Sequence, residues 1–332
     1  MKNTTLNRKS FILQSSLAGI ALAMPTWMMA GAVSPAQTGK RIGIIGLDTS
    51  HSIAFAKWFN RDQADGETGG FKVVAAYPQG SLDIVSSTSR IPANTEEIKK
   101  YGVSIASSIA ELLNQVDVVC LETNDGRRHL EQAIEVFQAG KTVFIDKPVT
   151  ASLKDAISLY EAAEKYKVPV FSSSSLRYTA NTKLVAKGDF GSVLGADTYS
   201  PATIEKTHPD LFWYGIHGVE MLYAVLGTGC RSVYRSYSPD ADLVIGEWAD
   251  GRIGTFRGTR KGKADFGGTA FCEKANVQLG PFAGYISLLE EIVRFFQTGI
   301  APVSPKETIE LIAFMEAADK SRKKGKAIRL SV

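Results

Sequence analysis

Cysteine is scarce in this 332-residue sequence, and its three cysteines are too scattered to form a metal or redox motif. No two of them (Cys120, Cys230 and Cys272) are spaced as a CxxC motif. This spacing argues against a zinc site or a thioredoxin-like site built from thiols. Cys120 falls in an apolar, strand-like run, where we expect a small buried thiol. Cys230 and Cys272 could pair in an exported protein only if their Cα atoms lie close together and correctly oriented. We therefore expect no disulfide framework.

A strong charge of either sign is also lacking. The formal net charge is +4, and three of the basic residues, Lys2, Arg8 and Lys9, fall in the first nine positions. Without those three the charge is about +1, which argues against binding to nucleic acid or to an anionic membrane surface. The sequence has no internal repeat and no low-complexity segment. Its length and its 44% hydrophobic content suit two ordinary globular domains.

The N-terminus has the pattern of a targeting segment, which we assign to residues 1–32. A basic start is followed by a modestly apolar stretch over residues 11–29 and by the small residues Ala30-Gly31-Ala32. Polar and proline interruptions argue against a permanent membrane helix, and no lipobox cysteine follows. Residues 7–12 resemble a twin-arginine signal in which Lys9 replaces the second arginine, and a Sec leader is the alternative. We expect a periplasmic protein.

Strand-like and helix-like segments alternate from residue 40 to residue 173, after a short linker at residues 33–39. This rhythm predicts βαβ units and a Rossmann-type, doubly wound parallel sheet of the α/β class. The expected strands are Arg41–Leu47, Phe71–Ala76, Val103–Ala106, Val116–Leu121, Thr142–Ile145 and Val168–Phe171. The expected helices are Ser50–Asn60, Thr95–Tyr101, Ser108–Asn114, His129–Gln138 and Ser152–Lys167.

The pattern changes after a boundary near residues 172–176, and we expect a second, α+β domain over residues 174–332. Residues 232–279 read as strands joined by Gly-containing turns, with hairpin signals at Asp250-Gly251 and Gly267-Gly268. These strands predict a mostly antiparallel open sheet. The expected helices are Tyr214–Leu226, Gly284–Gln297 and Pro305–Arg322.

The turn after the first strand stands where a dinucleotide-binding GxGxxG motif would stand. Gly46 takes the first glycine position, but Asp48 and His51 take the second and third. A carboxylate beside a pyrophosphate is repulsive by about 1 kcal/mol in water at about 4 Å. Thr49 and Ser50 supply hydroxyls, and the helix N-terminus supplies free amides. Asp48 could instead serve as a helix cap.

Further nucleotide-binding candidates follow the next strands. No acid follows the second strand to hold ribose hydroxyls, but Ser81 with Arg90 could accommodate a 2′-phosphate, unless that loop is simply solvated. Thr123 and Asn124 follow the strand Val116–Leu121 at the same sheet edge. His129, at a helix start, either lines this crevice or is exposed.

Lys147 is the first catalytic candidate. It lies in Asp146-Lys147-Pro148, directly after the strand Thr142–Ile145, at the sheet edge where such folds bind ligands. A lysine there can bind a substrate hydroxyl or donate a proton. The alternative is that Lys147 is exposed to solvent and has no role in catalysis.

His217 is the second catalytic candidate, in a sequence with only four histidines. It sits beside glycines and after Trp213 and Tyr214, which suits the wall of a sugar site, although a buried structural histidine is the alternative. Arg177 and Tyr178 could bind substrate hydroxyls or simply close the interface between the domains.

Together these motifs resemble the Gfo/Idh/MocA oxidoreductases over about residues 40–330. The family's order and spacing recur between Val116 and Pro148, in Asp117-Val118-Val119, His129, Ala139-Gly140-Lys141 and Asp146-Lys147-Pro148. The family's triplet is Glu-Lys-Pro, so Lys147 matches its catalytic lysine while Asp146 is a change. The family's Asp-x-Gly-x-His motif aligns with residues 213–217, where His217 is kept and Trp213 replaces the acid.

The resemblance implies a periplasmic NAD(P)-dependent oxidoreductase acting on a sugar or sugar derivative. His217 would take the hydroxyl proton, Lys147 would polarise the same oxygen, and a tightly bound NAD or NADP would accept hydride. It also implies a homodimer formed through the second sheet. One alternative is a carbohydrate lyase, hydrolase or epimerase that oxidises its substrate transiently. Another is a sugar-binding protein that lost its nucleotide through Asp48 and His51.

Overall fold

The computed structural model describes residues 39–62 and 66–330. The predicted leader, and the linker up to residue 38, lie outside these residues, so both stay predictions. Within the described part, no helix is long and apolar enough to cross a membrane. All three cysteines are buried and free, as expected, and Cys120 lies in the strand β4.

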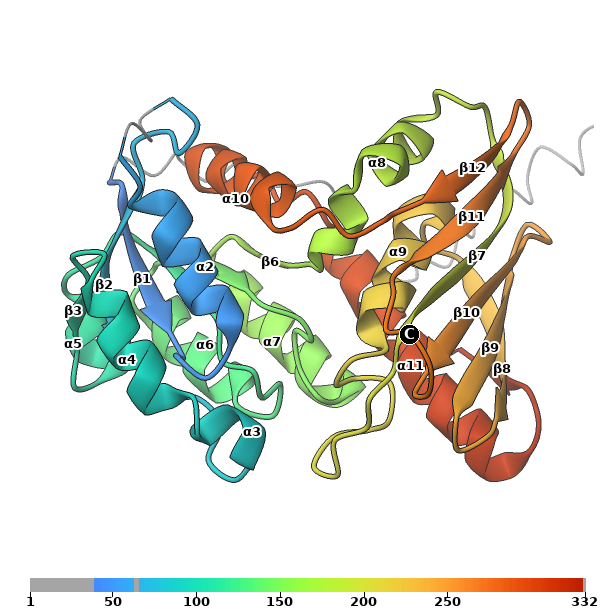
Figure 1. The fold of residues 1–332 in the computed structure, drawn as a ribbon, viewed down its shortest axis with the longest axis horizontal. Coiled ribbons are helices and arrows are strands. Elements are labelled where there is room, and N and C mark those ends of the chain that lie inside the picture. The colour runs from blue at the N-terminus through green and yellow to red at the C-terminus, as the bar shows by residue number, and fades with distance from the viewer. Residues whose placement is uncertain (1–38, 63–65, 331–332) are drawn as a thin grey trace, which may run out of the picture. The chain divides into compact units, whose positions relative to one another are not determined.

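The first sheet is parallel and six-stranded, in the order β3-β2-β1-β4-β5-β6 (Figure 1). Every strand and most helices lie within a few residues of the predicted positions, which confirms the Rossmann-type class. The strands are β1 (Arg41–Ile45), β2 (Lys72–Tyr77), β3 (Ser104–Ile105), β4 (Val118–Leu121), β5 (Thr142–Ile145) and β6 (Val170–Ser172). The helices are α2 (Ser50–Phe59), α3 (Val85–Thr88), α4 (Ile91–Lys99), α5 (Ile109–Leu113), α6 (His129–Gln138) and α7 (Leu153–Tyr166).

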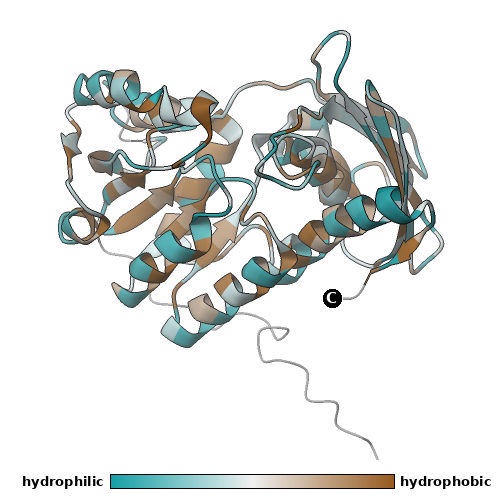
Figure 2. Ribbon diagram, turned by 90° about the horizontal axis from the view of Figure 1, so that it is seen from below, coloured by the Kyte–Doolittle hydropathy of each residue, from teal (hydrophilic) through white to brown (hydrophobic). Residues whose placement is uncertain are grey.

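The central strands of this sheet are buried along their whole length. All four residues of β4 and all four of β5 are inaccessible to solvent, as expected for parallel strands that helices cover on both faces. Figure 2 shows these strands as predominantly hydrophobic, with hydrophilic residues on the outer helices. Polar residues follow these apolar strands at their carboxyl ends. This edge of the sheet forms one wall of the candidate active site.

The second sheet is seven-stranded and mostly antiparallel, in the order β12-β11-β7-β10-β9-β8-β13, with one parallel pair, β7 and β10. This confirms the predicted class. Its strands are β7 (Val193–Pro201), β8 (Cys230–Tyr237), β9 (Ala241–Trp248), β10 (Ile253–Thr259), β11 (Gly267–Cys272), β12 (Asn276–Leu279) and β13 (Ile328–Arg329). Its helices are η2 (Ser175–Tyr178), α8 (Ala180–Lys187), α9 (Ile216–Leu226), α10 (Ile286–Thr298) and α11 (Pro305–Lys324).

The two predicted hairpin signals have different outcomes. Asp250-Gly251 does join the antiparallel strands β9 and β10, with Gly251 at φ +90°. Gly267-Gly268 is not a turn, because both residues lie inside β11 and pair with β7. A Cβ on Gly268 would approach the carbonyl oxygen of Asp197 to 2.3 Å, so glycine here permits close contact between two backbones.

Helix α10 follows the second sheet in sequence but packs against the core of the first. Phe295 contacts Phe171 of β6 with ring centroids 4.7 Å apart, and Phe296 contacts Phe71 at 5.6 Å. Leu288, Leu289 and Ile292 of the same helix join this buried cluster. The boundary near residues 172–176 stays a prediction, but packing assigns α10 to the first sheet. The loop before α10 is thereby drawn to the edge of the site.

Candidate active site

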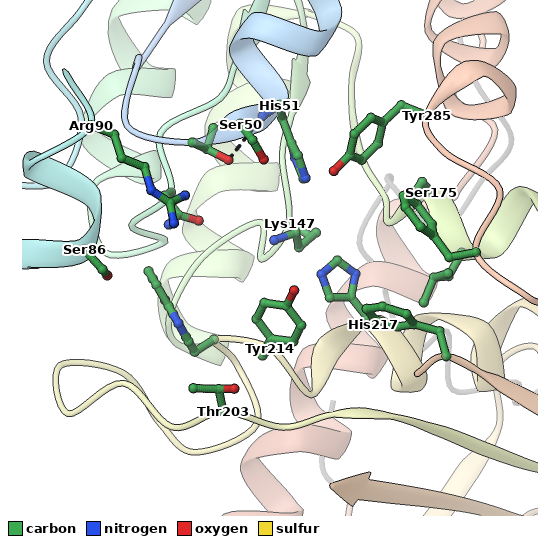
Figure 3. Close-up of a pocket in the computed structure, with 16 residues that line it drawn as sticks. Ser50, His51, Ser86, Arg90, Lys147, Ser175, Thr203, Tyr214, His217 and Tyr285 are labelled. Carbon is green, nitrogen blue, oxygen red and sulfur yellow. Dashed lines mark hydrogen bonds between the residues drawn. The ribbon is translucent and has the colours of Figure 1, made fainter. Parts of the chain in front are cut away.

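A cavity of about 470 Å³ lies at the carboxyl ends of β1, β4 and β5, between the first sheet and α9 (Figure 3). From the first sheet and its helices it is lined by Thr49, Ser50, His51, Ser86, Arg90, Asn124 and Lys147. From the rest of the chain it is lined by Ser175, Leu176, Thr203, Trp213, Tyr214, His217, Phe266, Phe282 and Tyr285.

Lys147 enters this cavity directly after β5. The buried run of β5 carries the chain to the edge of the sheet, and the lysine is only 6% exposed. In Figure 3 its side chain lies in the cavity between those of His51 and His217. The structure therefore brings the two predicted catalytic residues to one cavity, although their roles stay predictions.

His217 lies in the first turn of α9 and is held in a fixed orientation. Its Nδ1 atom is 2.8 Å from Ser174 Oγ, and its ring meets the rings of Tyr214 and Phe266 at centroid distances of 5.2 and 5.7 Å. Burial lowers the pKa of His217 well below its usual value, and the charge of Lys147 lowers this pKa further. The imidazole is therefore neutral at neutral pH and able to accept a proton.

A cluster of acidic groups lies beside Lys147. His51 Nδ1 is 2.7 Å from Asp146 Oδ2, and Glu122, directly after β4, is fully buried next to them. Burial raises the pKa of Glu122 well above its usual value, and Asp146 adds to this. Burial also disfavours ionised Asp146, but His51 and Lys147 outweigh that effect and lower its pKa to about 2. Sequence reasoning missed Glu122, although an acid directly after an apolar strand was a usable signal.

Asp48 does not contact the cavity. Its carboxylate is buried and accepts hydrogen bonds from Ser81 N and Ser81 Oγ, both at 2.7 Å, and from Asn124 N at 3.1 Å. Thr49, not Asp48, is the N-cap of α2 and accepts a hydrogen bond from His51 N at 3.4 Å. The predictions of Asp48 as a cap and of Ser81 as a cofactor contact are therefore wrong, because both side chains fasten loops together inside the protein.

Three other predicted cofactor residues also lie behind the cavity wall. Gly46 has φ +91°, and a Cβ there would come within 2.6 Å of the Thr123 backbone, so this glycine serves the tight turn. His129 is buried, with Nε2 2.6 Å from Thr123 O and Nδ1 2.9 Å from Pro148 O. It braces two loops. None of Gly46, Thr123 and His129 lines the cavity, whereas the predicted Thr49, Ser50, His51 and Asn124 do.

Arg177 and Tyr178 are not in the cavity either, which corrects their predicted role in substrate binding. Arg177 Nε is 2.9 Å from Glu220 Oε2, and Nη2 is 2.6 Å from Glu307 Oε1. Tyr178 is part of the core cluster around the first sheet. Arg177 thus links α9 and α11, whereas Tyr178 packs in the core of the first sheet. The predicted Trp213 and Tyr214 do line the cavity.

Sequence patterns gave no sign of several lining residues, because they come from loops without a local motif. Tyr285 packs edge-on against His51 with ring centroids 4.7 Å apart, and Phe282 packs against Tyr285 at 5.5 Å. The loop that carries Trp213 is anchored to the first sheet by His208, whose Nε2 lies 3.3 Å from Asp125 Oδ1.

Solved structures of dehydrogenases share this fold. The chain superposes with a TM-score of 0.71 on a probable dehydrogenase from Thermotoga maritima, at 20% identity over 87% of this chain and 98% of that one. It also superposes with a TM-score of 0.69 on myo-inositol dehydrogenase from Lactobacillus casei in complex with NAD(H) and myo-inositol. That match has 14% identity and covers 88% of this chain and 97% of the other. At these identities the likeness establishes the fold.

Sequence comparison points to one family. An uncharacterized oxidoreductase from Streptococcus pneumoniae serotype 4 is 27% identical over 128 residues, which are 37% of this chain and 35% of that protein. Residues 40–174 match the model of the oxidoreductase family with an NAD-binding Rossmann fold. Residues 40–174 therefore carry the NAD-binding Rossmann domain of the Gfo/Idh/MocA oxidoreductase family.

Proposed function

We propose that this chain is an NAD(P)-dependent oxidoreductase that acts on a sugar or sugar derivative. The observation that carries the proposal is the meeting of Lys147 and His217 in one cavity with polar and aromatic walls. The family match of residues 40–174 and the myo-inositol complex of a structural neighbour support the same chemistry. Trp213 and Tyr214 provide aromatic faces against which a sugar ring can pack.

The donors at the N-terminus of α2 fit the phosphates of a dinucleotide. After β1, the Asp48 carboxylate accepts hydrogen bonds from Ser81 N and Asn124 N. Thr49 and Ser50 line the cavity at the helix N-terminus, opposite Ser86 and Arg90. Amides, hydroxyls and a guanidinium are a chemically suitable set for phosphate oxygens.

The proposal covers NAD and NADP alike. Among the described residues directly after β2, residues 78–81, there is no carboxylate to hold ribose hydroxyls. When bound, the nicotinamide would supply the hydride acceptor, and Asn124 and Lys147 both line the cavity that would hold it.

The chain's own residues supply the proton chemistry. For His217 Nε2 to accept the substrate hydroxyl proton, Nδ1 must carry a hydrogen and donate it to Ser174 Oγ, which lies 2.8 Å away. The Lys147 ammonium group donates a hydrogen bond to the same substrate oxygen and stabilises the negative charge that develops there. Ser174 thus acts as a positioning residue for the base.

The pH dependence of kcat/KM tests His217 as the base. Because burial lowers the pKa of His217, the neutral imidazole persists as the pH falls, and the acidic limb is expected to have its midpoint below pH 6.5. His217→Gln is expected to lower kcat by about 10²–10⁴-fold. A midpoint at or above 6.5 that His217→Gln leaves in place would assign the limb to another group.

Cofactor binding tests the oxidoreductase assignment directly. Near-ultraviolet absorbance and mass spectrometry of freshly purified protein, followed by calorimetry with NAD, NADP and their reduced forms, are expected to reveal one bound nicotinamide per chain. Arg90→Ala is expected to weaken that binding about tenfold, whereas Arg252→Ala, in the exposed pair with Asp250, is the control.

If no nicotinamide binds at millimolar concentration, the cofactor part of the proposal fails. If substrate is consumed with no net change in cofactor redox state, the lyase, hydrolase or epimerase alternative replaces net oxidation.

The proposal places the protein in the periplasm as a homodimer. The targeting pattern of residues 1–32 supports export, and cell fractionation tests it. Exposed hydrophobic residues on the second sheet support self-association, which light scattering tests. These residues are Leu194, Tyr234, Ile253 and Phe271.

A further inference from the structure

His51, Glu122 and Asp146 form a cluster at the inner wall of the cavity. They come from the first turn of α2, the residue after β4 and the residue after β5, and the sheet brings these three points together. One possible ligand atom from each side chain lies within 4.8 Å of the others. Glu122 and Asp146 are inaccessible or nearly so, whereas His51 lines the cavity.

Glu122 is the unusual member of this cluster. It is 0% exposed, and neither carboxylate oxygen has a hydrogen-bond partner in the described structure. Asp48, another fully buried acid at this sheet edge, accepts three hydrogen bonds. A buried carboxylate without a partner is costly unless it is paired or binds a cation. Glu122 is therefore a buried acceptor that no group among the described residues satisfies.

We propose that His51, Glu122 and Asp146 bind a divalent transition-metal ion such as Zn²⁺ or Mn²⁺ through one imidazole nitrogen and one oxygen of each carboxylate. Ligand atoms at about 2.1 Å from one ion lie at most about 4.2 Å apart. A tetrahedral ion places its ligand atoms about 3.4 Å apart, so the spacing of up to 4.8 Å has to close by roughly 1.4 Å. The ion replaces the hydrogen bond between His51 and Asp146 and displaces the proton that burial favours on Glu122, so that both carboxylates bind it.

The ligand set indicates the type of ion and its use. One imidazole and two carboxylates suit zinc or manganese better than the softer ions that prefer thiolates. Three protein ligands leave at least one coordination position open, as in catalytic rather than structural zinc sites. That position would face the cavity shared with Lys147 and His217, where it could hold hydroxyl or carboxylate oxygens of the substrate.

This site goes beyond the proposed oxidoreductase function and does not require a dinucleotide. The charge of Lys147 acts on both Glu122 and Asp146, and the Tyr285 ring packs against His51. The charge of Lys147 reduces the attraction of the site for a cation, while the two carboxylates together compensate the charge of a divalent ion.

The full chain, stripped with a chelator, tests the proposal. Calorimetry with ZnCl₂ and MnCl₂, with MgCl₂ as a comparison, is expected to give one equivalent of bound Zn²⁺ or Mn²⁺ and weaker binding of Mg²⁺. Glu122→Gln and His51→Ala are each expected to weaken the binding at least tenfold, because each removes one ligand. Glu131→Gln, an exposed glutamate on α6, is the matched control and is expected to bind as the wild type does.

Thermal unfolding separates loss of the site from loss of the fold. Adding Zn²⁺ or Mn²⁺ is expected to raise the Tm of the stripped wild type, since a ligand that binds only the folded state stabilises it. Stripped Glu122→Gln is expected to be at least as stable as the stripped wild type, because a neutral amide replaces a buried carboxylate, yet to show no metal-dependent rise. Equal metal-dependent rises in both proteins, or no binding of Zn²⁺ or Mn²⁺ to the wild type, would overturn the proposal.

Discussion

Lys147→Ala is expected to lower kcat by about 10²–10⁴-fold while the protein remains folded. The lysine is 6% exposed directly after β5, and its side chain lines the same cavity as His217. Its removal deprives the substrate oxygen of a cationic donor, and no other lysine lines the cavity in the described part of the chain. Steady-state kinetics with a polyol series and the circular dichroism spectrum are the measurements.

Two variants control this experiment. Lys154→Ala removes an exposed lysine from the first turn of α7 and is expected to leave kcat unchanged. Lys147→Arg keeps the charge but replaces a compact ammonium with a planar guanidinium, so partial activity at most is expected. Turnover of Lys147→Ala at the wild-type rate would show that the reaction takes place without this side chain.

Arg177→Met is expected to lower the free energy of unfolding by about 3–5 kcal/mol. The guanidinium is paired with Glu220 of α9 and Glu307 of α11, and both the arginine and Glu220 are almost inaccessible. Removing one partner leaves an uncompensated charge in the interior, which is the costly way to break a buried ion pair. Guanidinium-induced unfolding followed by fluorescence measures the loss.

The same variant separates a structural role from a role in substrate binding. At a temperature where it remains folded, Arg177→Met is expected to retain the wild-type KM, because Arg177 does not line the cavity. Arg252→Met, in an exposed pair with Asp250, is expected to leave the unfolding midpoint nearly unchanged. A large rise in KM with little change in stability would restore Arg177 as a substrate-binding residue.

Much of the cavity was predictable, because parallel strands deliver the residues that follow them to one edge of the sheet. Lys147, after β5, and the Thr49–His51 segment, after β1, were placed correctly by this rule alone. His217 was found from the resemblance and from the scarcity of histidine. The rule failed for Ser81 and His129, since the end of a strand indicates an edge but not the direction in which a side chain turns.

The alternation of apolar strands and amphipathic helices determined the parallel sheet by itself. The spacing of apolar residues within each segment shows which of its faces are buried. Tertiary structure alone decided that α10 returns to the first sheet and that Arg177 is buried between two acids. It also decided that Glu122 lies beside His51 without a hydrogen-bond partner among the described residues. Local pattern records how much of a residue is buried, but the partner that it meets depends on segments far away in the chain.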